Sequence, residues 1–223
     1  YQDGGLIPRG PSGGNYTYVM TGASSTPFIV SAYQKGIRGF DIEMAYEGLK
    51  KNHRPGGIME KAGYEHKTSL GGGLSYYLLN GYVPWPIPEG NFGFHQDGPS
   101  LTLEYAYQDW TLAQLAKALG DKAGEQEFLK RSENYKNTFD AETSWMRPRN
   151  VDGSWKTPFD PYEYNAGFNE ANGSQGTWFV PHDLDGLADL MGGKEKTIER
   201  LNTSFEESEM LGFTSGTSHS QET

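Results

Sequence analysis

The sequence predicts a mainly α-helical fold, a toroid or solenoid built from helix hairpins with long connecting loops. Three observations support this prediction. Apolar residues recur at helical spacing in consecutive pairs of segments, the period-2 alternation of strands is nearly absent, and the intervening stretches are rich in glycine, proline and aromatic residues. The 223 residues are enough for one large domain or two small ones.

The first predicted pair of helices covers residues 27–35 and 41–52. Residues 1–26, which are rich in Gly, Pro, Ser and Asn, precede this pair as a loop. Asp41 is a candidate N-cap of the second helix, because helical spacing follows it directly. The apolar positions of that helix are Ile42, Ala45, Tyr46 and Leu49.

Residues 53–98 form the least regular stretch, and the clearest helix follows them at residues 100–119. Three prolines within five residues exclude a helix interior and a central strand around residues 84–88. We expect Ser100 to cap the helix and Gly120 to end it. The apolar stripe of this helix consists of Leu112, Leu115, Ala116 and Leu119.

The C-terminal half continues the same pattern. A second helix is predicted over residues 124–139, with Phe128, Ser132 and Tyr135 on one side, and loops return over residues 140–181. Asp183 is then expected to cap a helix over residues 184–191, which Gly192 and Gly193 end. A final amphipathic helix carries Ile198, Leu201 and Phe205.

Composition excludes several classes of protein. The 29 acidic and 19 basic residues give a net charge of -10, and the basic residues are scattered, so nucleic acid is not an expected partner. No stretch approaches the ~18 apolar residues of a membrane span. Cysteine is absent, which rules out disulfides, thiolate metal sites and cysteine nucleophiles. Because the chain opens at Tyr1, we expect it to be a fragment or a processed piece, so a missing signal peptide is uninformative.

Three familiar catalytic motifs are absent from the sequence. The Gly192-Gly193-Lys194 run lacks two residues of the phosphate-loop pattern, no serine lies in G-x-S-x-G, and no histidine lies in H-E-x-x-H. The run from Asp183 to Gly186 resembles part of a calcium loop but lacks the ligands at its third and twelfth positions.

The segment 169–183 is the best candidate for a functional site. Its carboxylate, Glu170, stands among small residues and neutral hydrogen-bonding side chains, which match the hydroxyl groups of a sugar. The polar neighbours are Asn169, Asn172, Ser174 and Gln175, and the aromatic pair Trp178 and Phe179 can cover the apolar face of a sugar ring. The alternative interpretation is a polar loop between two helices.

Glycoside hydrolysis normally needs two carboxyl groups, of which Glu170 is the candidate acid. Other carboxylates in polar or aromatic surroundings are Glu104, Asp109, Asp160, Asp183 and Asp185. Glu104 and Asp109 lie on the helix predicted over residues 100–119, where we expect them to tie helices or loops together.

Many short motifs resemble, in order, the calcium-dependent exo-α-mannosidases of glycoside hydrolase family 92. The matching segments are residues 1–10 (YQDGGLIPRG), 18–22 (YVMTG), 103–110 (LEYAYQDW), 113–120 (AQLAKALG), 131–137 (RSENYKN), 146–149 (MRPR), 152–155 (DGSW), 159–161 (FDP), 178–183 (WFVPHD) and 191–193 (MGG). The resemblance therefore extends over nearly the whole chain.

The resemblance implies part of an (α/α)6 toroid catalytic domain, an upstream β-sandwich domain, an inverting mechanism and a bound Ca²⁺. The family's general acid is the glutamate of E-G-N-A-W-Q-Y-T-W-F-V-P-H-D, which matches Glu170. This chain departs from that motif at Ala171, at Gly173-Ser174 and at Gly176. The family's aspartate base and most of its calcium ligands lie beyond the position that matches Thr223.

From this resemblance we expect residues 1–223 to be a partial catalytic domain of a secreted, periplasmic or cell-surface α-mannosidase that acts on mannose-containing glycans. Its expected sugar-binding or acid-supporting residues are Asn172, Gln175, Trp178, His182 and Asp183. Two alternatives stay open. One is a non-catalytic carbohydrate-binding helical toroid, and the other is a different (α/α)6 enzyme, such as a glucosidase or a polysaccharide lyase.

Overall fold

The structure is a computed structural model that describes residues 4–12, 15, 16, 18–61, 71–88 and 97–211. Its elements in chain order are β1 (Pro11–Ser12), β2 (Asn15–Tyr16), α1 (Ser25–Gln34), α2 (Ile42–Asn52), η1 (Ile58–Glu60), α3 (Leu74–Asn80), α4 (Gly98–Leu119), α5 (Lys122–Ser132), η2 (Glu133–Thr138), β3 (Phe139–Asp140), β4 (Trp145–Met146), α6 (Gly173–Gly176), α7 (Leu184–Leu190) and α8 (Lys194–Met210). Each pair of strands, β1 with β2 and β3 with β4, is a short antiparallel ladder.

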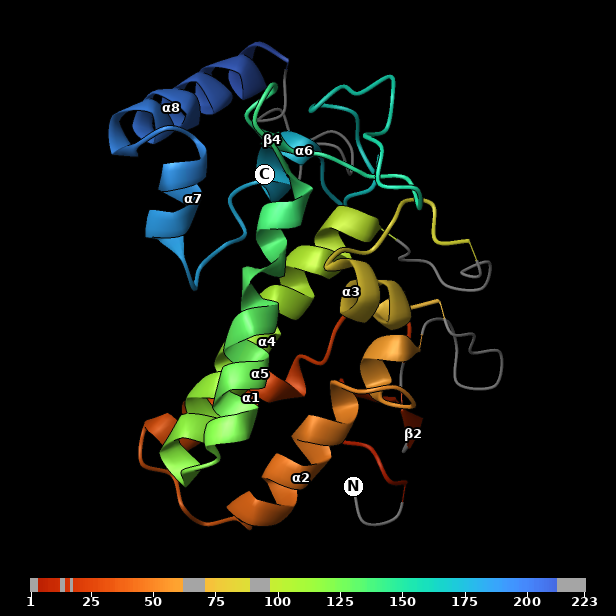
Figure 1. Ribbon diagram of the computed structural model, residues 1–223, viewed down its shortest axis with the longest axis vertical. Helices are drawn as coiled ribbons and strands as arrows, with labels where there is room; N and C mark the ends of the chain where they lie inside the picture. Colours follow the sequence, from red (N-terminus) through yellow and green to blue (C-terminus); the bar gives the residue numbers. More distant parts are fainter. Residues whose placement is uncertain (1–3, 13–14, 17, 62–70, 89–96, 212–223) are drawn as a thin grey trace.

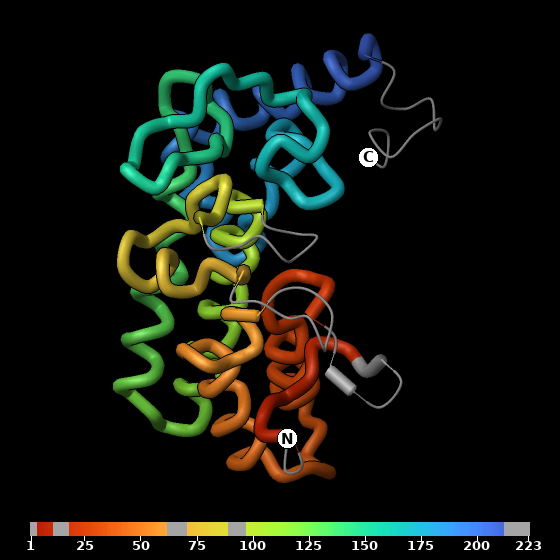
Figure 2. The backbone as a smooth tube through the Cα atoms, turned by 90° about the vertical axis from the view of Figure 1, so that its right-hand side faces the viewer, coloured from red at the N-terminus to blue at the C-terminus, as the bar shows by residue number. Residues whose placement is uncertain are grey.

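The helices are arranged along an elongated molecule. α1, α2, α4 and α5 lie side by side at one end, and α7 and α8 lie at the other (Figure 1). The view turned by 90° shows the same separation and places the long loops after β4 at the α8 end (Figure 2). α4 runs between these two ends, so it can connect them.

α4 is buried because it contributes to each of the three apolar clusters formed by the described residues. Leu101 and Tyr105 belong to a cluster with the N-terminal segment and α3, and Leu103 belongs to one with the β3–β4 hairpin and α7. Leu112 and Leu115 pack against α1, α2 and α5. A helix that is apolar on every side is expected in the interior of a domain.

A buried polar cluster joins α4 to three neighbouring helices. The Asp109 carboxylate on α4 accepts hydrogen bonds from His53 Nδ1 (2.8 Å), Tyr77 Oη (2.9 Å) and Arg131 Nε (2.8 Å). His53 Nε2 in turn lies 2.9 Å from Thr26 Oγ1 on α1. The prediction that Asp109 ties helices together is therefore confirmed.

Most helix boundaries agree with the sequence predictions. Asp41 and Asp183 cap α2 and α7 by accepting hydrogen bonds from the backbone N–H groups of Met44 and Gly186, and Gly120 ends α4 in the left-handed region with a φ of 79°. No helix within the described residues is long and apolar enough to cross a membrane.

Two boundary predictions were wrong. α4 begins at Gly98 rather than at Ser100, because Pro99 takes a place in the first turn, where its fixed φ suits a helix and its missing N–H costs nothing. The helix predicted over residues 124–139 is α5 followed by the tighter η2, although Phe128, Ser132 and Tyr135 are all buried as expected.

Candidate functional site

The Glu170 loop, residues 165–171, is held at three points. The N–H of Asn165 donates to the carbonyl oxygen of Ala171 (2.8 Å) and closes the loop. The Phe168 side chain is fully buried in the cluster that contains Leu103. The N–H of Asn169 donates to Ser100 Oγ on α4 (3.0 Å), so the loop is attached to the first turns of that helix.

Glu170 is exposed and lies near the C-terminal end of this loop. Its φ of 50° is in the left-handed region, which residues other than glycine rarely adopt. Such conformations persist where the surrounding structure enforces them, and they concentrate at functional sites. The anchored loop therefore presents the Glu170 carboxyl group to solvent from a defined backbone position.

The short helix α6 follows directly and carries two of the predicted binding residues. The side chain of Asn172 accepts a hydrogen bond from the N–H of Gln175 (3.0 Å), and the side chain of Gln175 accepts one from the N–H of Asn172 (3.0 Å). This reciprocal pair is a capping box, which satisfies N–H groups at the start of the helix. Asn172 is fully buried, so it supports the loop from inside the protein.

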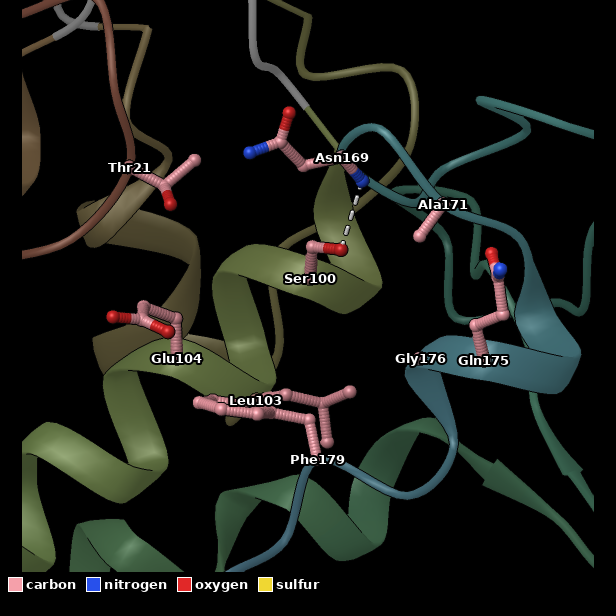
Figure 3. Close-up of a pocket in the computed structure, with 9 residues that line it drawn as sticks. All are labelled: Thr21, Ser100, Leu103, Glu104, Asn169, Ala171, Gln175, Gly176 and Phe179. Carbon is pink, nitrogen blue, oxygen red and sulfur yellow. Dashed lines mark hydrogen bonds between the residues drawn. The ribbon is translucent and has the colours of Figure 1, made fainter. Parts of the chain in front are cut away.

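A cavity of about 260 Å³ lies beside the Glu170 loop. Its lining residues come from the N-terminal loop, from α4 and from the segment on both sides of Glu170; they are Thr21, Ser100, Leu103, Glu104, Asn169, Ala171, Gln175, Gly176 and Phe179. Figure 3 shows Thr21, Glu104 and Asn169 toward one side of this space, Gln175 toward the other, and Leu103 with Phe179 below them. Both chain neighbours of Glu170 line the cavity.

Glu104 is the carboxylate of this cavity. Burial raises its pKa, while a hydrogen bond from Gln108 Nε2 and the nearby positive charge of Arg9 act in the opposite direction. Burial lowers the pKa of Arg9 to about 10, so Arg9 stays protonated at neutral pH. The Arg9 guanidinium donates to the carbonyl oxygens of Met20, Gly22 and Ile58 and thereby holds the segment that carries Thr21.

The side chains of His182 and Asp183, two more predicted binding residues, form hydrogen bonds within the protein. His182 Nε2 donates to the Ser132 carbonyl oxygen (3.2 Å), and burial lowers the pKa of the imidazole. The Asp183 carboxylate accepts from Gly186 N (3.0 Å) and Tyr135 Oη (2.7 Å). Burial opposes ionisation of Asp183, but these hydrogen bonds outweigh it and lower its pKa.

The two aromatic residues 178 and 179, which were predicted to cover a sugar ring together, have different surroundings in the structure. Trp178 packs against the cluster of Phe168, with its ring 6.5 Å from that of Trp145. Phe179 is 41% exposed, lines the cavity and contacts Tyr107 edge to face at 5.8 Å. Of the predicted binding residues, only Gln175 therefore lines the cavity, together with the neighbours of Glu170.

Thr21 and Glu104 were not predicted to lie at the site, whereas Phe179, which was named as part of the aromatic pair, does line the cavity. The sequence contains one indication that Glu104 lies near Ser100. The two residues are four positions apart and therefore share a face of α4. Nothing in the local pattern indicates that the segment after Glu170 packs against this face. That contact links residues far apart in the chain.

The described residues do not gather a cluster of metal-binding side chains. They contain no group of three or more His, Asp or Glu side chains that could together hold an ion. A Ca²⁺ ion would therefore need backbone or amide carbonyl oxygens, or residues outside the described part of the chain, to complete its shell.

Comparison with known proteins gives consistent matches. The model of the glycosyl hydrolase family 92 catalytic domain matches residues 1–222. The structure of a GH92 inverting mannosidase from Bacteroides thetaiotaomicron is 30% identical, with a TM-score of 0.79, and the match covers 97% of this chain and 30% of that one. A GH92 α-mannosidase from the same species is 34% identical over 88% of this chain and 24% of its own, with a TM-score of 0.72.

Two further matches add to these. The latter α-mannosidase also matches in a complex with mannoimidazole, with 32% identity over 89% of this chain and 24% of its own and a TM-score of 0.73. A protein from Arthroderma benhamiae described as an uncharacterized secreted glycosidase is 27% identical over 210 residues, which are 83% of this chain and 26% of that protein. The chain thus spans about a quarter to a third of the length of these relatives.

Proposed function

Because the chain belongs to glycosyl hydrolase family 92, we propose that the intact protein is an exo-acting, inverting α-mannosidase whose general acid is Glu170. The observation that carries this proposal is the position of Glu170 on an anchored, left-handed loop whose two neighbours line a cavity of polar and aromatic side chains. The relatives described as mannosidases support mannose as the sugar that is released.

In this mechanism Glu170 donates its proton to the glycosidic oxygen as the bond to the mannosyl ring breaks. A second carboxylate activates water on the opposite face of the ring and stands ~6.5–9.5 Å from the acid in an inverting enzyme. We assign that base to a part of the intact protein outside this segment. Gln175 lines the cavity and Asn172 caps the short helix directly after Glu170, while His182 hydrogen-bonds to the Ser132 carbonyl oxygen and Asp183 caps α7.

The proposal extends to the architecture and location of the intact protein. The mainly helical segment would form part of an (α/α)6 toroid that packs against an upstream β-sandwich domain. Ca²⁺ would be held mostly by residues outside this segment and would bind and orient hydroxyl groups of the sugar. The relative described as a secreted glycosidase supports a secreted, periplasmic or cell-surface location.

The direct test is to incubate the intact protein with α-mannosides and to follow the products by NMR. We expect free mannose, released first as the β-anomer because the mechanism inverts configuration. Binding of mannosides without any release would indicate a non-catalytic carbohydrate-binding protein. Release of another sugar, or cleavage by elimination, would indicate a different enzyme of the toroid type.

A further inference from the structure

We infer that Glu104 and Asn169 are sugar-binding residues, which accept hydrogen bonds from hydroxyl groups of a neutral pyranose in the cavity beside Glu170. This inference rests on the proposed function and assigns a substrate-binding role to two residues of the same site. It also makes Glu104 a determinant of specificity, because a buried carboxylate disfavours an anionic ligand.

Asn169 supplies the first line of support. Its side-chain Oδ1 is buried and has no hydrogen-bond partner among the described residues. A buried acceptor without a partner is costly, so such groups are found where a ligand or water completes them. The backbone N–H of Asn169 is held by Ser100, and this fixes the residue at the wall of the cavity (Figure 3).

Glu104 supplies the second line. Its carboxyl group lies at the same cavity and receives one hydrogen bond from Gln108; burial raises its pKa, and the nearby charge of Arg9 acts in the opposite direction. An ionised carboxylate accepts hydrogen bonds through two oxygens and has capacity beyond a single partner. Hydroxyl groups of a ligand fit this capacity in either protonation state, whereas the ionised form of Glu104 would repel a phosphate or carboxylate.

The remaining walls select the shape of the ligand. Leu103 and the exposed face of Phe179 form an apolar surface below the polar groups (Figure 3). A pyranose ring has one face of C–H groups and a rim of hydroxyls, so it can contact both. The volume of about 260 Å³ lies below the ~300–1,000 Å³ of sites for drug-sized molecules and suits one sugar unit.

The experiment uses the intact protein in the Glu170→Gln background and measures mannose binding by calorimetry. We expect Glu104→Gln to weaken binding by about 10- to 100-fold, the range for hydrogen bonds to a charged group. Asn169→Ala should weaken it by about 2- to 10-fold, as for a neutral hydrogen bond. Since Asn169 Oδ1 has no partner in the part of the chain that the structure describes, a structural role of this oxygen would not produce that loss.

Glu43→Gln, at an exposed position in the first turn of α2, is the matched control and should leave affinity unchanged. Glu104→Gln in the active enzyme should raise KM far more than it lowers kcat. Unchanged mannose affinity in both the Glu104 and the Asn169 variants would overturn the inference. Absence of mannose release by the wild-type protein would instead overturn the proposed function, and tighter binding of a uronic acid than of mannose would refute the selection for neutral sugars.

Discussion

Single residues around Glu170 show how local packing determines the shape of the candidate site. Gly176 lines the cavity and lies against the buried ring of Phe168, where an added Cβ would come closer than real Cβ atoms approach. Phe168 in turn anchors the Glu170 loop. A larger side chain at position 176 would therefore displace Phe168 and, with it, the loop that positions the candidate acid.

Gly176→Ala is expected to lower the free energy of unfolding by ~1–3 kcal/mol, the usual cost of overpacking. Phe168 must move to admit the methyl group, so activity should fall together with stability. Gly39→Ala is the matched control, because a Cβ there would meet nothing within 4 Å. Chemical denaturation of both variants measures the effect, and equal stability of the Gly176 variant and the wild type would contradict this account of the loop.

At the scale of secondary-structure elements, the helices could be predicted well from the sequence. Apolar spacing and the caps at Asp41 and Asp183 are local signals, and the structure confirms them. The contact between α4 and the Glu170 loop could not be predicted, because it depends on tertiary packing of distant segments. For the same reason Glu170 could be identified from the sequence as a candidate acid, whereas Glu104 was interpreted only as a residue that ties helices or loops together.

α4 depends on the Asp109 cluster for its attachment to α2, α3 and α5. We expect Asp109→Ala to cost ~3–5 kcal/mol of unfolding free energy, because it leaves the fully buried His53 and the partly buried Arg131 without their partner. Asp189→Asn, at an exposed position on α7, should change stability by less than ~0.5 kcal/mol. A loss below ~1 kcal/mol in the Asp109 variant would show that the cluster does not hold these helices together.

The same cluster predicts a pH dependence of stability. Burial lowers the pKa of His53 below its ordinary value of 6.5, although Asp109 acts in the opposite direction. The unfolded chain therefore binds a proton below pH 6.5 that the folded protein does not, so the unfolding free energy should fall as the pH drops from 7.5 to 5.5. Denaturation midpoints should show a shallower pH dependence for His53→Gln than for the wild type, and an equal slope in the two proteins would contradict this assignment.

At the scale of the whole molecule, α8 is hardly buried by the rest of the described residues, since Ser204 is its one buried residue among them. Of its predicted apolar stripe, Ile198 is 59% exposed and Phe205 is 71% exposed. The spacing correctly predicted a helix but could not show that these side chains lie at the surface of this segment. The relatives are about three to four times longer than the chain, so the activity of the intact protein involves more than the residues described here.

Calcium dependence is a prediction for that intact protein. Treatment with EDTA should abolish mannose release, and Ca²⁺ should restore it better than Zn²⁺, because oxygen ligands favour Ca²⁺ and the segment has neither cysteine nor zinc-type histidine spacing. Elemental analysis of the purified protein provides an independent readout. Full activity after exhaustive chelation, with no calcium in the sample, would refute the prediction.

The central claim is that Glu170 is the general acid, and Glu170→Gln in the intact protein tests it most directly. The amide keeps the shape of the side chain but cannot donate the proton, so kcat on a mannoside with a poor leaving group should fall by about 10²- to 10⁴-fold. A leaving group that needs no proton should partly restore the rate, and the thermal unfolding midpoint should stay the same. Activity within about twofold of the wild type on the poor leaving group would contradict the assignment.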